Sequence, residues 1–168
     1  DNISPDGQNA TSPQVAMDDK GNAIIVWQQN DGSSKSQIFK SEYRGGVWTH
    51  PGGLSDNISP DGQNATSPQV AMDGKGNAII VWHQNDGKKS QIFKSEHRGG
   101  VWTHPGGLSD NISPDGQDAS SPQVAMDNDG NAIIVWRQLD GANYQIFMSE
   151  YRGGVWTHPG GLSDNISP

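Results

Sequence analysis

The sequence predicts an all-β protein, and three observations point to this class. The stretch of residues 12–27 returns almost unchanged at 67–82 and at 121–136. Each copy carries an Ile-Ile-Val triplet and aromatic residues at fixed places, a composition typical of strands. The 22 Gly and 10 Pro fall mostly between these apolar runs, where turns require them. Apolar residues gathered in this way indicate a folded chain and not a disordered one.

The first two strands of each unit form a predicted hairpin. In the first unit they cover about 14–17 and 23–29, and Asp18–Asn22 lies between them. Gly21 supplies a residue that adopts positive φ without strain, as a tight turn demands.

Two further strands complete the unit. After the turn at 30–32 we expect a third strand at about 37–43, with Phe39 and Tyr43 on one face. A Gly-Gly turn leads to a short fourth strand at 47–50, and Pro51 stops it. The connector at 52–67 is long for a compact domain, as is typical of a crossover between successive sheets.

The second strand is apolar on both faces, so it needs a packing partner on each side. A half-exposed antiparallel strand would instead alternate apolar and polar residues. We therefore expect sheets stacked face to face, with polarity rising toward the fourth strand. The predicted core consists of the following residues and their copies: Val15, Met17, Ile24, Ile25, Val26, Trp27, Ile38 and Phe39.

Four strands repeated with a period near 54 residues predict β-propeller blades. The units are 1–55, 56–109 and 110–163, all within one propeller domain, and 164–168 restarts the pattern. This redundant stub is typical of a piece excised or engineered from a longer array.

The units also resemble a known family. The segments 13–18, 21–27 and 43–48 look like blades of bacterial sialidase-like propellers, and the Asp-x-x-Gly turn is similar to an Asp-box hairpin. The turn departs from the Ser-x-Asp-x-Gly-x-x-Trp pattern of that family, because Met17 and not a serine precedes the aspartate. The resemblance implies the fold and carries little information about activity.

Three blades are too few for a ring, since propellers have about 4–8 blades. An open arc exposes an apolar face at each end, and identical copies can cover each other's faces. We predict a homodimer with six blades, favoured over a trimer with nine, and a structural or assembly scaffold as its function.

The alternative function is a multivalent carbohydrate-binding, lectin-like propeller with one site per blade. Its candidate set combines an aromatic platform with a carboxylate and an arginine, which suits stacking and hydrogen bonding to a sugar. The other interpretation is that Trp48 packs between blades and Arg44 pairs with Glu42. The candidate residues are Glu42, Tyr43, Arg44 and Trp48, then Glu96, Arg98 and Trp102, then Glu150, Tyr151, Arg152 and Trp156.

Hydrolysis of the sialidase type is a third possibility that the sequence disfavours. A catalytic site needs different groups that converge on one point, whereas every unit offers the same Arg and Glu. We therefore expect no enzymatic activity.

We expect no metal site and no cofactor. The turn 127–131 has the start of a calcium loop but lacks a bidentate glutamate, so a plain hairpin turn explains it. The net charge of −8 and the lack of basic clusters argue against a nucleic-acid partner. No apolar run reaches the length of a membrane helix. With no cysteine, the compartment stays open.

Overall fold

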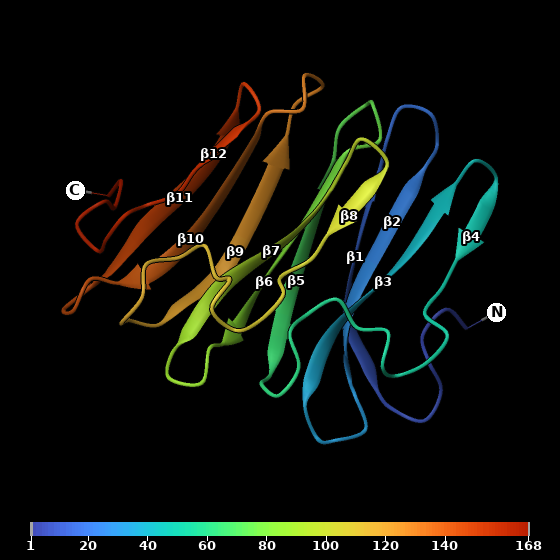
Figure 1. Ribbon diagram of the computed structural model, residues 1–168, viewed down its shortest axis with the longest axis horizontal. Coiled ribbons are helices and arrows are strands. Elements are labelled where there is room, and N and C mark those ends of the chain that lie inside the picture. The colour runs from blue at the N-terminus through green and yellow to red at the C-terminus, as the bar shows by residue number, and fades with distance from the viewer. Residues whose placement is uncertain (1, 168) are drawn as a thin grey trace.

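The computed structural model describes residues 2–167, which form three antiparallel sheets of four strands each (Figure 1). Each sheet follows one sequence repeat, and its strands are hydrogen-bonded in chain order. The strands are β1 (Ala10–Met17), β2 (Ala23–Asn30), β3 (Ser36–Arg44) and β4 (Val47–Thr49) in the first sheet; β5 (Ala65–Met72), β6 (Ala78–Asn85), β7 (Ser90–Arg98) and β8 (Val101–Thr103) in the second; and β9 (Ala119–Met126), β10 (Ala132–Leu139), β11 (Tyr144–Arg152) and β12 (Val155–Thr157) in the third.

The β1–β2 hairpin closes through the side chain of Asp18. Its Oδ1 accepts the backbone N–H groups of Lys20 at 2.9 Å and Asn22 at 2.8 Å, and Asn22 Nδ2 donates to its Oδ2 at 2.6 Å. Gly21 has a φ of 82°, which a residue with a Cβ adopts only under strain. Both carboxylate oxygens are therefore used within the turn, as the sequence-based hairpin interpretation requires.

The first strand begins four residues earlier than predicted. The register of β1 against β2 shifts between Thr11 and Gln14, and Ser12 has a φ of 54°. This β-bulge takes Pro13 out of the hydrogen-bond ladder, so the strand continues past a residue that cannot donate. Ser67 and Ser121 occupy the corresponding bulges of the other two sheets, and each has a φ of 56°.

The three sheets stack like blades around their first strands. β1 contacts β5 and β5 contacts β9, while the fourth strands lie on the outside (Figure 1). Each sheet has a trailing face toward the following blade, made by Ile24, Val26 and Ile38 in the first blade. Its leading face toward the preceding blade contains Ile80, Trp82 and Phe93 in the second blade. The prediction of an all-β, blade-like architecture with a two-sided second strand is confirmed.

Part of the predicted core is wrong for the first blade. Val15 and Met17 are each 63% exposed. Their copies Val70 and Met72 pack against the core cluster between the first two blades. The difference arises because, among residues 2–167, no blade covers the leading face of the first sheet. Ile25 on the same face is also only half-buried.

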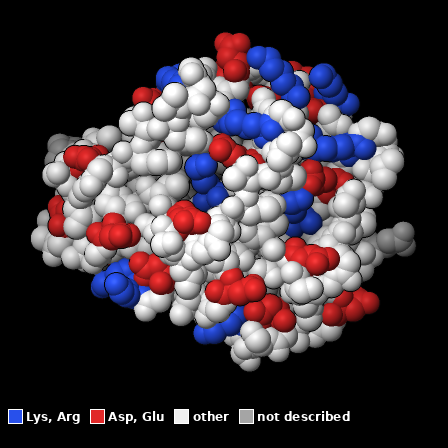
Figure 2. Space-filling model, viewed as in Figure 1, with Lys and Arg blue, Asp and Glu red and all other residues white. Residues whose placement is uncertain are grey.

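Charged side chains of both signs are interspersed over the face shown in Figure 2. Most of the basic side chains in this view lie in its upper part, where acidic side chains stand beside them. Within residues 2–167 the structure has no helix long and apolar enough to cross a membrane.

Candidate functional site

The candidate residues come together at the junction between two blades. Trp102 on β8 of the second blade reaches back to the trailing face of the first blade, where its Nε1 donates to Glu42 Oε1 at 2.7 Å. Arg44 Nε donates to Glu42 Oε2 at 2.9 Å, and Lys40 Nζ pairs with the same carboxylate. Lys40 also lies 4.7 Å above the Trp102 ring. We call Lys40, Glu42, Arg44 and Trp102 the first junction cluster.

The Glu42 carboxylate is held in its charged form. Burial raises its pKa, but hydrogen bonds from Arg44, Lys40 and Trp102, together with the charge of Lys40, outweigh burial and bring the pKa below its ordinary value. With its side chain 14% exposed, this group is a paired structural anion. It offers few free lone pairs to a ligand.

Arg44 continues the junction into the next hairpin. Its Nη1 donates to the Gly76 carbonyl at 3.1 Å, and its Nη2 lies 3.2 Å from His97 Nδ1. One guanidinium thus ties the first blade to both a turn and a strand of the second. Such a fork of donors in a fixed geometry suits arginine better than lysine.

The same cluster recurs at the next junction. Trp156 Nε1 donates to Glu96 Oε2 at 2.9 Å, and Lys94 lies 4.8 Å above the Trp156 ring. Arg98 donates to the Gly130 carbonyl at 3.1 Å and lies 3.6 Å above the ring of Tyr151. Lys94, Glu96, Arg98 and Trp156 form the second junction cluster.

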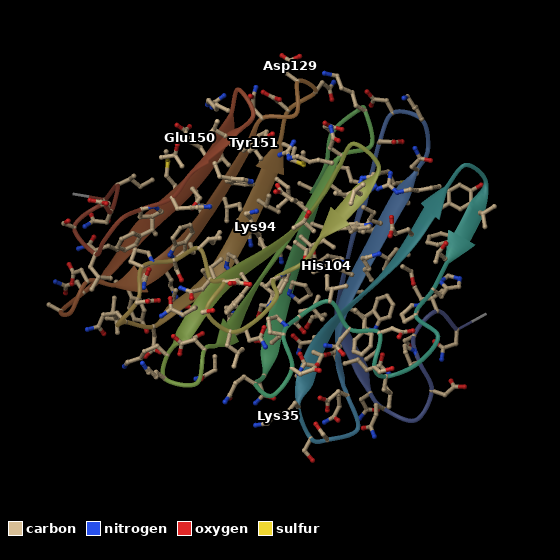
Figure 3. The ribbon with its side chains drawn as sticks, in the orientation of Figure 1. Lys35, Lys94, His104, Asp129, Glu150 and Tyr151 are labelled. Atoms are coloured by element: carbon tan, nitrogen blue, oxygen red, sulfur yellow. The ribbon has the colours of Figure 1, made fainter. Side chains whose placement is uncertain are left out.

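Among the remaining candidates, Trp48, Glu150 and Arg152 lie at the two ends of the arc, where no neighbouring blade of the described chain covers them. Glu150 and Arg152 bond each other at 3.1 Å, but their side chains are 35% and 55% exposed. Trp48 is 43% exposed, and in the described chain no carboxylate is bonded to its indole N–H. Figure 3 shows Glu150 and Tyr151 on opposite sides of β11, so only Tyr151 lies toward the second blade. The structure therefore separates the Glu and Trp of one repeat and joins those of neighbouring repeats.

The candidate set does not include the histidines that stack on these tryptophans. His50 stacks on Trp48 with ring centroids 5.6 Å apart, and His104 stacks on Trp102 at 5.5 Å. Each histidine also bonds a buried serine, as His104 Nδ1 does with Ser95 at 2.9 Å. The available signal was the spacing of two residues between each tryptophan and its histidine, since residues at this spacing in extended chain share a face.

Comparisons with solved structures show that the fold is similar to that of several sialidase- and glycosidase-like propellers at low sequence identity. A Hadza microbial sialidase matches with a TM-score of 0.59 and 12% identity, over 88% of this chain and 36% of the sialidase. A polysaccharide lyase matches at 0.60 and 11%, over 89% and 40%, and an endo-arabinase from Bacteroides thetaiotaomicron at 0.55 and 13%, over 89% and 58%. The chain thus spans between about a third and three fifths of these proteins. No protein-family model and no curated protein matches the sequence.

These neighbours confirm the sialidase- and glycosidase-like fold at a coarse level and correct one prediction. We expected no enzymatic activity because the repeats offer identical groups at each position. Most of the neighbours are glycosidases or lyases, so the exclusion is wrong: this fold is one that enzymes use. Identical residues in every repeat therefore do not rule out an activity, because one fold can carry many different functions.

Proposed function

We propose that this chain is one half of a six-bladed propeller that a second copy completes, and that its function depends on this assembly. One observation carries the proposal. The two open faces of the arc are the two halves of an interface that the chain already forms twice within itself. The trailing face of the third blade keeps Ile133, Val135 and Ile146 of the buried trailing faces before it. The leading face of the first blade has the same residues as the leading face of the second apart from Tyr43, which is His97 there.

The exposed apolar side chains are those that a neighbouring blade covers elsewhere. Ile133 and Ile146 on the open trailing face are 36% and 43% exposed, whereas Ile24 and Ile38 at the same positions in the first blade are fully buried. Covering them removes apolar surface from water at a gain of roughly 25 cal/mol per Å².

Three positions of the open trailing face are more apolar than their internal counterparts, whereas Arg137 replaces Gln28 and His83 on the same face. In the third repeat Leu139, Tyr144 and Met148 replace the Asn, Ser and Lys of the first two repeats. All three lie on the trailing face by the alternation of β10 and β11. A repeat that ends an array in water would carry polar residues there. The change therefore supports a face that another surface covers.

The polar groups at the ends are complementary as well. Arg152 would lie over Tyr43 of the second copy as Arg98 lies over Tyr151. The Trp48 indole of that copy would donate to Glu150, as Trp102 does to Glu42. Met148 takes the lysine position of the junction clusters, where a thioether also packs well against an aromatic ring.

The test is the mass in solution. We expect about 36 kDa, twice the 18.0 kDa of one chain, by sedimentation equilibrium or native mass spectrometry. Ile146→Lys should yield a folded monomer. Val155→Lys is the matched control in the same blade: the valine is exposed in every blade alike, at 64% here, and so lies outside the blade contacts. A wild-type chain that stays monomeric at all concentrations would refute the assembly. The open faces would then be surfaces that further blades of a longer polypeptide cover.

Carbohydrate recognition is the second candidate function. It is favoured by the ring of Trp48, which is exposed in the single chain beside Tyr43 with centroids 5.3 Å apart, and by a neighbour named as a polysaccharide lyase. A glycan array probed with the wild type and with Trp48→Ala tests it. Binding that is lost in the variant supports the site, and silence across the array refutes it. A fluorogenic sialoside assay of the same two proteins tests hydrolysis.

A further inference from the structure

Each blade binds an Asn-Ile-Ser segment at the trailing edge of its third strand, at a site that we call the seat. Each chain contains one such segment more than it has seats. In the first blade the seat holds Ile58 and Ser59 from the connector. Ile58 N donates to the Ile38 carbonyl at 2.8 Å, and Ile38 N donates to Ser59 Oγ at 3.0 Å. Ser59 Oγ in turn donates to the buried Gln37 Oε1 at 2.5 Å. One strand end thus recognises both the backbone and the hydroxyl of the segment.

The seat is occupied in the same way in the other two blades. In the second blade Ile112 N donates to the Ile92 carbonyl at 2.8 Å, and Ser113 provides the hydroxyl at 2.9 Å from Ile92 N. In the third blade the occupant is the stub itself. Ile166 N donates to the Ile146 carbonyl at 2.8 Å, and Ile146 N donates to Ser167 Oγ at 3.1 Å. Ser167 Oγ also bonds Gln145.

The segment at the start of the chain has the same sequence and no seat. Asn2-Ile3-Ser4 stands in the first repeat where Asn57-Ile58-Ser59 stands in the second. The Ser4 hydroxyl donates to Asn2 Oδ1 at 2.8 Å within its own segment, whereas Ser59 and Ser113 bond the glutamine of a preceding blade. Ile3 lines a hollow on the open leading face together with Ile25 and Trp27.

Closure by a second copy brings two segments to one seat. The incoming leading face carries its own Ile3 and Ser4 to the trailing edge of β11, where Ile166 and Ser167 already lie. Ile166 is seated but 56% exposed, whereas Ile58 and Ile112 in the internal seats are 7% and 8% exposed. Its exposure reflects the missing leading face and not a missing hydrogen bond.

We infer that the third-blade seat is an exchange site: at each seam between copies it takes either the chain's own 165–167 or the partner's 2–4, and either segment suffices. This inference rests on the proposed assembly. Because the two occupants have the same sequence and make the same bonds, each can replace the other with little change in the free energy of association. Residues 165–167 of one copy therefore compete with residues 2–4 of the other copy for the same site.

The experiment is a double-mutant cycle on the dissociation constant of the dimer. Ile3→Ser and Ile166→Ser are measured singly and together by sedimentation at several concentrations. Each single variant should change the dissociation constant by less than about threefold, because the other segment fills the seat. The double variant should raise it by about thirtyfold or more, since neither segment then brings an apolar side chain to the seam. Circular dichroism of the dilute monomers checks that all variants fold alike.

The outcomes separate the inference from the assembly on which it rests. A monomeric wild type removes the assembly itself. A dimeric wild type in which one single variant is as weak as the double variant shows that only one segment is used, and this overturns the exchange. A double variant as tight as the wild type shows that the seat lies outside the seam, which also overturns it.

Discussion

Single residues at the blade junctions serve neighbouring repeats and not their own. Glu42 lies two residues from Arg44 and six from Trp48, which suggested one compact site per blade. In the folded chain its carboxylate accepts the indole N–H of Trp102 at 2.7 Å, from the next repeat. The pairing gives this partly buried anion its partners, and leaving the charge unpaired at the junction would destabilise the fold.

His83 is a partly buried side chain whose protonated form opposes folding. Its Nε2 lies 2.8 Å from Thr66 Oγ1, and its Nδ1 is buried without a hydrogen-bond partner in the described residues. Burial lowers the pKa of His83 below its ordinary value of 6.5. The unfolded chain therefore binds the proton more readily than the folded chain. The contribution of neutral His83 to stability is therefore fully present above pH 6.5, and it is lost as the pH falls through the lowered pKa of the folded state.

We predict that His83→Gln weakens this pH dependence. Gln is the residue of the first repeat at this position, where Gln28 Oε1 accepts the Ser67 N–H at 2.8 Å. Urea unfolding at pH 7.5 and at pH 5.5 should show a smaller loss of unfolding free energy in the variant than in the wild type. His97, His104 and His158 also have a pKa lowered by burial, so some loss remains. An equal loss in both proteins would contradict the assignment.

At the scale of elements, a short outer strand fixes how two blades meet. β8 spans only Val101–Thr103, yet its Trp102 bonds Glu42 and lies under Lys40. β4 has the same sequence in the first blade, but there its Trp48 is 43% exposed. Identical strands therefore have different energetic roles, because packing and not sequence decides how much each tryptophan buries.

We predict that Trp102→Ala lowers the unfolding free energy of the chain by about 2–3 kcal/mol, as large-to-small changes at packed sites do. Trp48→Ala is the matched control and should change it by less than about 1 kcal/mol under monomeric conditions. Urea unfolding of dilute protein measures both. Equal effects would mean that the junction cluster adds nothing to stability. At higher concentration Trp48→Ala should instead weaken association.

At the scale of the whole molecule, two blade faces of the arc have no partner blade within the described chain. Two core clusters fill the two internal blade junctions, while Val15, Met17 and Ile146 remain exposed at the ends. Apolar surface of this extent marks a binding surface or an aggregation liability. A second copy is the favoured partner because these two open faces correspond to the two sides of the internal blade junctions.

Assembly predicts a melting temperature that depends on concentration, because a partner that binds only the folded chain stabilises it by mass action. Differential scanning calorimetry across a hundredfold range of concentration should show a rising melting temperature for the wild type. Ile146→Lys should abolish this dependence. A wild-type melting temperature that is constant over the whole range would count against the closed ring.

The sequence by itself determined the number and order of the strands and the stacking of the sheets, but not the bulge that extends β1 to Ala10. Alternation in residues 37–43 predicted the correct faces of β3, and the two-sided apolar run at 23–29 predicted burial on both sides of β2. Local spacing suffices for these features because side chains in a strand alternate with a period of two. It also led to the Glu, Arg and Trp that form the junctions, but not to which copies of them meet.

Tertiary structure alone decided the pairing and the burial. The bond between Glu42 and Trp102 joins residues 60 apart in sequence, so no local pattern contains it. Val15 and Val70 have the same neighbours in sequence, yet 63% of Val15 is exposed while Val70 packs in a core. Burial is a property of what lies across an interface, and a repeat cannot encode whether a neighbouring blade is present.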